Sequence, residues 1–386
     1  MSLLRTAGHT GAMLGTLAAE RAANDIEVLS RAGLPVDEFL DEARTVLGTV
    51  VPHLAACIGT HDPVTEMLTS GRKFGDLALH DASDPLFAIL EYGGAESTTF
   101  SAITQAVGMR AAGLGDEGSS VRLDRLIRPM FGYDDELRLA FRDGAGLWGG
   151  IALFRGADDR AFDEREVAWA AGLSGAFARG VRVGTLAQLG GAPMIDTSVD
   201  GPAVVIIDAA DEIARMSSGA QQRLLQLGEA ADSTDPIGTV YALVTAARRM
   251  VATPDAALPR ARVRTRSGIW LVLHASPLSA CDGVTGEVVV TIEEARPSEV
   301  VDLVVAAFAL TPRERDVTAM VLRGAETRDI AGTLHLSAYT VQDHLKSIFD
   351  KAGVRSRREL ITKVYLDQYL TRNDQPVGPS GWYLPG

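Results

Sequence analysis

Two stretches of apolar residues at helical spacing open the chain, at about residues 12–33 and 37–57. Gly33 and Pro35 separate them, because neither residue favours the interior of a helix. In the second stretch, Phe, Leu, Val and Ala recur every three or four residues. Both predicted helices therefore have an apolar face that needs a packing partner.

Helical spacing gives way to alternation later in the chain, which indicates β-structure. Residues 136–142 alternate strictly between two faces, and residues 147–154 form a second apolar run. The Asp143-Gly144 pair between them is typical of a tight turn, so a β-hairpin is predicted. The period becomes helical again over residues 163–183, which predicts a helix after the hairpin.

The order of these elements resembles a known α+β fold. An opening helix is followed by Ala55-Ala56-Cys57, Thr60-His61-Asp62-Pro63 and Thr69-Ser70-Gly71, then by a hairpin with Trp148-Gly149 and a closing helix. This pattern resembles a GAF domain over residues 36–185, preceded by an N-terminal helix in residues 1–35.

A second α+β unit is predicted after Leu189-Gly-Gly-Ala-Pro193, which has the composition of a linker. We expect a strand, two helices and three strands, at residues 203–207, 212–227, 238–251, 261–265, 269–275 and 287–292. This order resembles a PAS domain over residues 196–297. Such domains enclose small-molecule pockets in some families and only pack or dimerise in others, so both roles stay open.

Four short helices with clear capping signals are predicted between residues 310 and 370. Thr311, Thr327, Ser337 and Ser356 are the expected N-caps, and Gly353 is expected to end the third helix. Two short helices joined by a tight polar turn, the second with polar residues near its N-terminus, suit insertion into a DNA major groove.

The motifs in this segment are more specific than its helix pattern. They are Leu310-Thr-Pro-Arg-Glu-Arg, Arg328-Asp-Ile-Ala, Leu336-Ser-x-x-Thr340-Val341-x-x-His344 and Lys351-x-Gly353-Val354-x-x-Arg357. Together they closely resemble the LuxR-type helix-turn-helix domain of bacterial transcription regulators, over residues 306–370. The resemblance implies a double-stranded DNA operator as partner, contacted by Thr327, Ser337, Thr340, Val341, Gln342, Asp343, His344, Lys346, Arg355 and Arg357.

Some of these side chains have a chemistry that suits base edges. Lys346 can donate to guanine or to phosphate, Gln342 can pair with adenine, and Asp343 can accept from cytosine. Asp343 has a second interpretation, in which it orients Lys346 or repels phosphate. His344 is equally compatible with packing inside the domain.

The distribution of charge makes local DNA binding compatible with an acidic chain. The formal net charge is −13, which as a whole should repel nucleic acid and anionic membranes. Residues 310–370, however, carry ten basic and eight acidic side chains, so the acidic excess lies outside this segment. Because this small positive charge predicts modest nonspecific affinity, we expect a homodimer that doubles the footprint.

The remaining residues argue against other classes of site. Cys57 and Cys281 belong to no metal or redox motif, so both are expected to be reduced and buried. His53, His61 and His80 have no ligand spacing, so neither a metal nor a cofactor is expected. Trp148, Trp169 and Trp270 are expected in cores rather than around a ligand. The sequence shows no leader or membrane span, which predicts a cytoplasmic protein, and the tail of residues 371–386 is expected to be disordered.

The favoured interpretation is therefore a multidomain transcription regulator. Its GAF-like and PAS-like domains would sense a small-molecule effector, and RNA polymerase is a further candidate partner. One alternative makes these domains non-sensing dimerisation or protein-interaction modules. The other is an enzyme with an attached DNA-binding domain, although no P-loop, GxSxG, HExxH or dinucleotide motif occurs.

Overall fold

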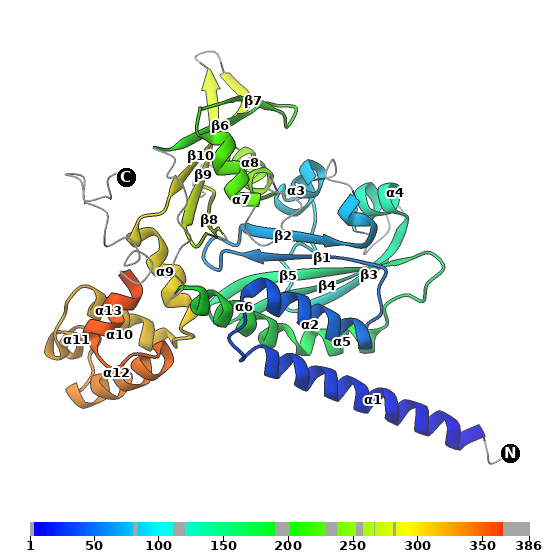
Figure 1. The fold of residues 1–386 in the computed structure, drawn as a ribbon, viewed down its shortest axis with the longest axis horizontal. Helices are drawn as coiled ribbons and strands as arrows, with labels where there is room; N and C mark the ends of the chain where they lie inside the picture. Colours follow the sequence, from blue (N-terminus) through cyan, green and yellow to red (C-terminus); the bar gives the residue numbers. More distant parts are fainter. Residues whose placement is uncertain are drawn as a thin grey trace.

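The computed structural model describes residues 4–79, 84–110, 120–189, 201–228, 238–251, 258–265, 267–280 and 283–365. The linker beyond Leu189, His80, Cys281 and the tail lie outside these ranges. The described part consists of two five-stranded antiparallel sheets with helices around them and a helical C-terminal segment (Figure 1).

The first sheet has the strand order β2-β1-β5-β4-β3 and packs on both faces. Its strands are β1 (Ala55–His61), β2 (Leu68–Phe74), β3 (Ala106–Arg110), β4 (Tyr133–Asp143) and β5 (Gly146–Gly156). One face packs on α2 (Val36–Val50), α5 (Glu164–Gly172) and α6 (Ser174–Leu189), with α1 (Leu4–Leu29) against α2 and α6. The other face packs on η1 (Gly75–Leu79), α3 (Asp84–Tyr92), η3 (Leu123–Ile127) and α4 (Arg128–Phe131).

The predicted hairpin is confirmed by β4 and β5, but two helix predictions are wrong in extent. The second helix ends at Val50 rather than near Cys57, because Pro52 follows and residues 55–61 form β1. β1 pairs with β2 on one side and β5 on the other, so sheet pairing outweighs the helical spacing of its apolar residues. The helix expected over residues 163–183 is two helices, α5 and α6, which meet at Leu173.

The second sheet repeats the same order of strands, as β7-β6-β10-β9-β8. Its elements are β6 (Ala203–Ile207), β7 (Ile213–Met216), α7 (Ala220–Gly228), α8 (Gly238–Met250), β8 (Arg260–Arg264), β9 (Trp270–Ala280) and β10 (Gly283–Glu294). The helix expected from residue 212 is therefore wrong at its start. Asp211 has a positive φ of 64° and turns the chain, so that Ile213 pairs with Ile207 in an antiparallel ladder.

Helix α9 (Pro297–Ala307) leads from the second sheet into the C-terminal helices. These are α10 (Pro312–Leu322), α11 (Thr327–Leu334), α12 (Ala338–Ala352) and α13 (Arg357–Tyr365). Trp270 and Val272 of β9 share one apolar core with α9 and with these four helices. The C-terminal segment therefore packs on the rest of the chain through α9, at the left of Figure 1.

The burial of the tryptophans agrees with the predictions from sequence, whereas that of Cys57 differs. Trp148 and Trp270 are buried, and Trp169 is half-buried, as core residues should be. Cys57 is half-buried rather than buried. Within the described ranges, no helix combines the length and apolarity that crossing a bilayer requires.

Candidate DNA-binding surface

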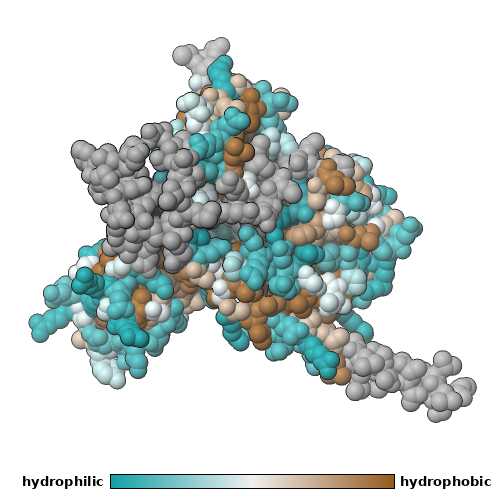
Figure 2. Space-filling view, in the orientation of Figure 1, coloured by the Kyte–Doolittle hydropathy of each residue, from teal (hydrophilic) through white to brown (hydrophobic). Residues whose placement is uncertain are grey.

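Helix α12 has one buried face and one exposed polar face. Its core side is buried, with Val341, Leu345, Ile348 and Ala352 inside. Gln342, Asp343 and Lys346 are exposed, and so is Tyr339, which is 77% accessible. In the view of Figure 2, hydrophilic side chains dominate the outer edge of the C-terminal helices. The residues expected to meet base edges therefore lie together on one accessible surface.

The start of α12 is fixed as its sequence predicts. Ser337 is the N-cap, and its Oγ accepts a hydrogen bond of 3.0 Å from the backbone N–H of Thr340. Before it, His335 takes a left-handed conformation with φ of 52° and ends α11. The resulting turn leaves the N-terminal end of α12 exposed, where free N–H groups suit a phosphate.

Glu314 of α10 forms hydrogen bonds with two residues of α12. Its carboxylate accepts hydrogen bonds of 2.6 Å from Ser347 Oγ and Lys351 Nζ, and one of 2.7 Å from the backbone N–H of Thr311. Burial raises the pKa of Glu314, but these bonds outweigh burial and hold the pKa at about 2. The carboxylate is thus charged at neutral pH and ties α12 to the start of α10.

Thr327 is not the N-cap of α11, contrary to the prediction. Glu326 occupies that position, and Thr327 is the first helical residue. The hydroxyl of Thr327 instead accepts hydrogen bonds from Gln342 Nε2 at 3.2 Å and Arg357 Nη2 at 2.8 Å. Arg357 Nη1 also donates to the carbonyl of Ala325 at 2.7 Å. Thr327 therefore joins α11, α12 and α13 at one oxygen.

The other residues expected to contact DNA differ in their exposure to solvent. Val341 is fully buried, so its side chain packs in the core. His344 is half-buried, and Arg355 is exposed. Within the described residues, no hydrogen bond or ion pair joins Asp343 to Lys346.

Sequence reasoning missed two features of this surface. The contact between Glu314 and Lys351 spans two helices, and only the capping role of Glu314 leaves a local signal. Tyr339 was also missed, although an aromatic residue beside Thr340 and Gln342 is a signal for an exposed stacking or packing group.

A small cavity lies mostly among residues of the first sheet and its covering helices, with Gly238 of α8 also in its wall. Its volume is about 70 Å³, and its walls include Leu77, Phe87, Phe100 and Phe131. That is less than half of the ~150 Å³ in which an engineered cavity holds benzene. The cavity therefore has room for a very small molecule only.

A group of buried charges lies on the same face of the first sheet. Arg122 pairs with Glu136 at 2.9 Å, and Arg138 pairs with Glu91 at 2.9 Å, with all four side chains at most 3% exposed. Glu96 accepts from the backbone N–H of Arg122 at 3.0 Å. Burial raises the pKa of Glu96, but its hydrogen bonds lower the pKa to about 2 overall. These pairs fix the inner face of β4, and the described residues hold no His, Cys, Asp and Glu cluster fit for a metal ion.

Comparisons with known proteins agree with the C-terminal geometry. Residues 309–364 match the family model described as bacterial regulatory proteins, luxR family. The chain is 45% identical over 53 residues to the HTH-type transcriptional regulator Mb0914c of Mycobacterium bovis. It is 40% identical over 57 residues to the monoamine regulon transcriptional regulator of Klebsiella aerogenes.

These matches are confined to one part of each chain. They cover 14% and 15% of this chain, which spans only 6% and 25% of the two relatives. Among solved structures, the GAF domain of A. aeolicus nlh2 is similar at 12% identity with a TM-score of 0.31, over 44% of this chain and 98% of that one. The C-terminal segment is a helix-turn-helix domain of the LuxR family.

Proposed function

We propose that this chain is a sequence-specific transcription regulator that binds a double-stranded DNA operator through α12. The observation that carries the proposal is the exposed row of Gln342, Asp343 and Lys346 on a helix whose other face is buried. Lys346 and Gln342 donate to purine edges, and Asp343 accepts from cytosine. In this proposal, Thr340 and Arg355 contact the phosphate backbone.

Selection of binding sites from a random duplex library, with the full chain, tests this proposal. Lys346→Ala is expected to weaken binding to the selected site by about 5- to 100-fold and to relax the base preference. Arg21→Ala removes an exposed positive charge from α1 and should change neither quantity. If the Lys346 variant selects and binds the same sites as the parent, α12 does not read the DNA.

We also infer that the region before α9 regulates this binding. The strand order shared by the two sheets supports a GAF-like domain over residues 36–185 and a PAS-like domain over residues 196–297. A small-molecule effector there would make the protein a sensor. We further propose that the protein is a cytoplasmic homodimer. It would contact RNA polymerase when bound at its operator.

The alternative is that both domains pack or dimerise without a ligand. The small volume of the cavity beside the first sheet favours this alternative for the first domain. Native mass spectrometry of the full chain separates the two, because a retained small-molecule adduct supports sensing and a bare protein mass supports a packing role. The same spectrum reports whether the protein is a dimer.

A further inference from the structure

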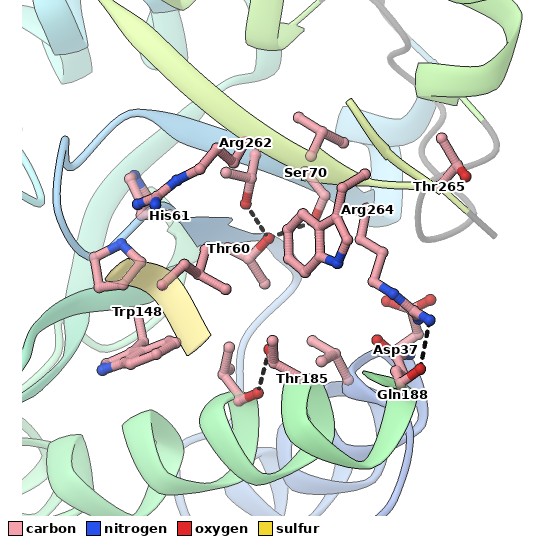
Figure 3. A pocket seen from close by; sticks show the side chains of 17 residues that line it. Asp37, Thr60, His61, Ser70, Trp148, Thr185, Gln188, Arg262, Arg264 and Thr265 are labelled. Carbon is pink, nitrogen blue, oxygen red and sulfur yellow. Dashed lines mark hydrogen bonds between the residues drawn. The ribbon is translucent and has the colours of Figure 1, made fainter. Parts of the chain in front are cut away.

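A larger cavity lies where the two sheets meet α6 and α9. Its volume is about 180 Å³. Figure 3 shows Thr60 and Ser70 of the first sheet, Thr185 and Gln188 of α6 and Arg264 of β8 around it. Leu303 of α9 lines it as well. This junction cavity therefore borders both sheets and α9. Because α9 leads into the C-terminal helices, a ligand bound here would contact the element that joins them to the rest of the chain.

Arg264 brings a positive charge to the junction cavity without a carboxylate partner in the described residues. One of its terminal nitrogens donates to the backbone carbonyl of Gln188, and its Nε is buried with no hydrogen-bond partner. Burial lowers the pKa of Arg264 to about 10, so it stays protonated at neutral pH. By contrast, Arg262 on the same strand is neutralised by Asp62.

The other charged groups around the cavity do not replace that partner. His61 is neutral, because burial lowers its pKa to about 3, with Arg138 and Arg142 acting in the same direction. Asp37 also lines the cavity; its backbone carbonyl accepts a hydrogen bond of 3.3 Å from Arg72, and among the described residues no ion pair joins its carboxylate to Arg264. A guanidinium therefore remains for an incoming anion.

The rest of the wall suits an aromatic ring. Trp148, Val181, Trp270 and Leu303 provide apolar surface. Trp270 is only 6% exposed, and its Nε1 is buried without a hydrogen-bond partner. The hydroxyl groups of Thr60 and Ser70 also line the cavity and are hydrogen-bonded to each other at 2.8 Å. The volume slightly exceeds the ~150 Å³ that accommodates benzene, so one ring with a small substituent fits.

We propose that the junction cavity binds a small monocyclic aromatic carboxylate, whose carboxylate pairs with Arg264 and whose ring lies against the apolar wall. This proposal names a ligand class for the sensing role proposed above. Only the effect of the ligand on DNA binding rests on that proposed function. Ligand binding is measured without DNA, so a negative result here leaves the proposed DNA binding intact.

Calorimetric titration of the full chain with benzoate, benzamide and benzylamine tests the proposal. Benzoate is expected to bind most tightly, benzamide more weakly, and benzylamine not at all, because only the carboxylate complements Arg264. Arg264→Gln should weaken benzoate binding by about tenfold or more, and Arg264→Lys should restore part of it. Arg260→Gln, on the same strand but outside the cavity wall, should leave the affinity within about twofold.

A second variant keeps the test valid if the Arg264 variants fold poorly. Thr185→Leu adds bulk to the cavity wall from α6 and should also weaken benzoate binding while keeping every charge. The proposal is overturned if no benzoate binding is detected up to about 10 mM, or if benzylamine binds as well as benzoate. It is equally overturned if a folded Arg264→Gln variant binds benzoate like the parent.

Discussion

Arg262 donates to both carboxylate oxygens of Asp62, at 2.6 Å each, and both side chains are fully buried. The pair joins the residue after β1, in the first sheet, to β8 in the second. Arg262 Nη1 also donates to the carbonyl of Glu299 in α9 at 3.1 Å. One guanidinium thus connects both sheets to the helix that leads into the DNA-binding domain.

Asp62→Asn should destabilise the whole chain rather than one domain. It leaves the charge of Arg262 buried without a counter-charge, for which we expect a loss of about 3–5 kcal/mol in the free energy of unfolding. Urea denaturation measures the loss. Asp316→Asn, at the exposed ion pair with Arg313, should cost about 1 kcal/mol or less. Equal effects of the two variants would show that the buried pair does not hold the sheets together.

Glu314 should make the stability of the C-terminal domain depend on acid pH. Its pKa is about 2 in the folded chain, below its ordinary value of 4.5, so the carboxylate stabilises the fold fully above pH 4.5. That contribution is lost as the pH falls from 4.5 towards 2. Glu314→Gln should therefore cost about 2 kcal/mol at neutral pH and progressively less in acid.

Denaturation curves of parent and variant at several pH values check the Glu314 prediction. Asp350→Asn removes an exposed carboxylate from α12 and serves as the matched control for charge. A difference between the Glu314 variant and the parent that stays constant down to the lowest pH would contradict a lowered pKa.

Features with a local cause were predictable from sequence. Ser337 caps α12 with its own hydroxyl, and Asp143-Gly144 turns the chain between two strands that pair directly. In each case the residues that determine the geometry are within a few positions of one another. The same holds for Gly353, whose positive φ ends α12.

Features that depend on distant partners could not be predicted in the same way. Asp62 and Arg262 are 200 residues apart, and neither stretch of sequence indicates the other. Thr327 has the composition of a cap, but its hydroxyl bonds to Gln342 and Arg357 from two other helices. Residues 55–61 are apolar enough for a helix, and only pairing with β2 and β5 makes them a strand.

Thr327→Ala should weaken DNA binding for all sequences to a similar degree. The change removes the oxygen that accepts from Gln342 and Arg357, so α12 loses a link to α11 and α13 while its base-facing side chains remain. We expect a loss of about 3- to 10-fold in affinity, measured for specific and nonspecific duplexes alike. Thr327→Ser keeps the hydroxyl and should bind like the parent. A change in base preference would contradict this prediction, and it would show that the hydrogen bond from Gln342 to Thr327 also sets how Gln342 meets the bases.

Two glycines of α6 allow the packing of this helix on α2 to be measured. A Cβ at Gly180 would lie 2.1 Å from the ring of Phe39, whereas a Cβ at Gly175 would meet nothing within 4 Å. Gly180→Ala should therefore destabilise the chain by about 1–3 kcal/mol, through overpacking. Gly175→Ala should stabilise it by about 0.5–1 kcal/mol, because alanine favours the helix.

Thermal denaturation of the two glycine variants gives a direct comparison. Both add the same methyl group to the same helix, so the gain in helix propensity cancels in the difference between them. What remains is the cost of separating α6 from Phe39. If both variants stabilise the chain equally, α2 does not pack closely on α6. The opposite signs expected here would confirm that close approach, and with it the position of the helix that carries Thr185 and Gln188 to the junction cavity.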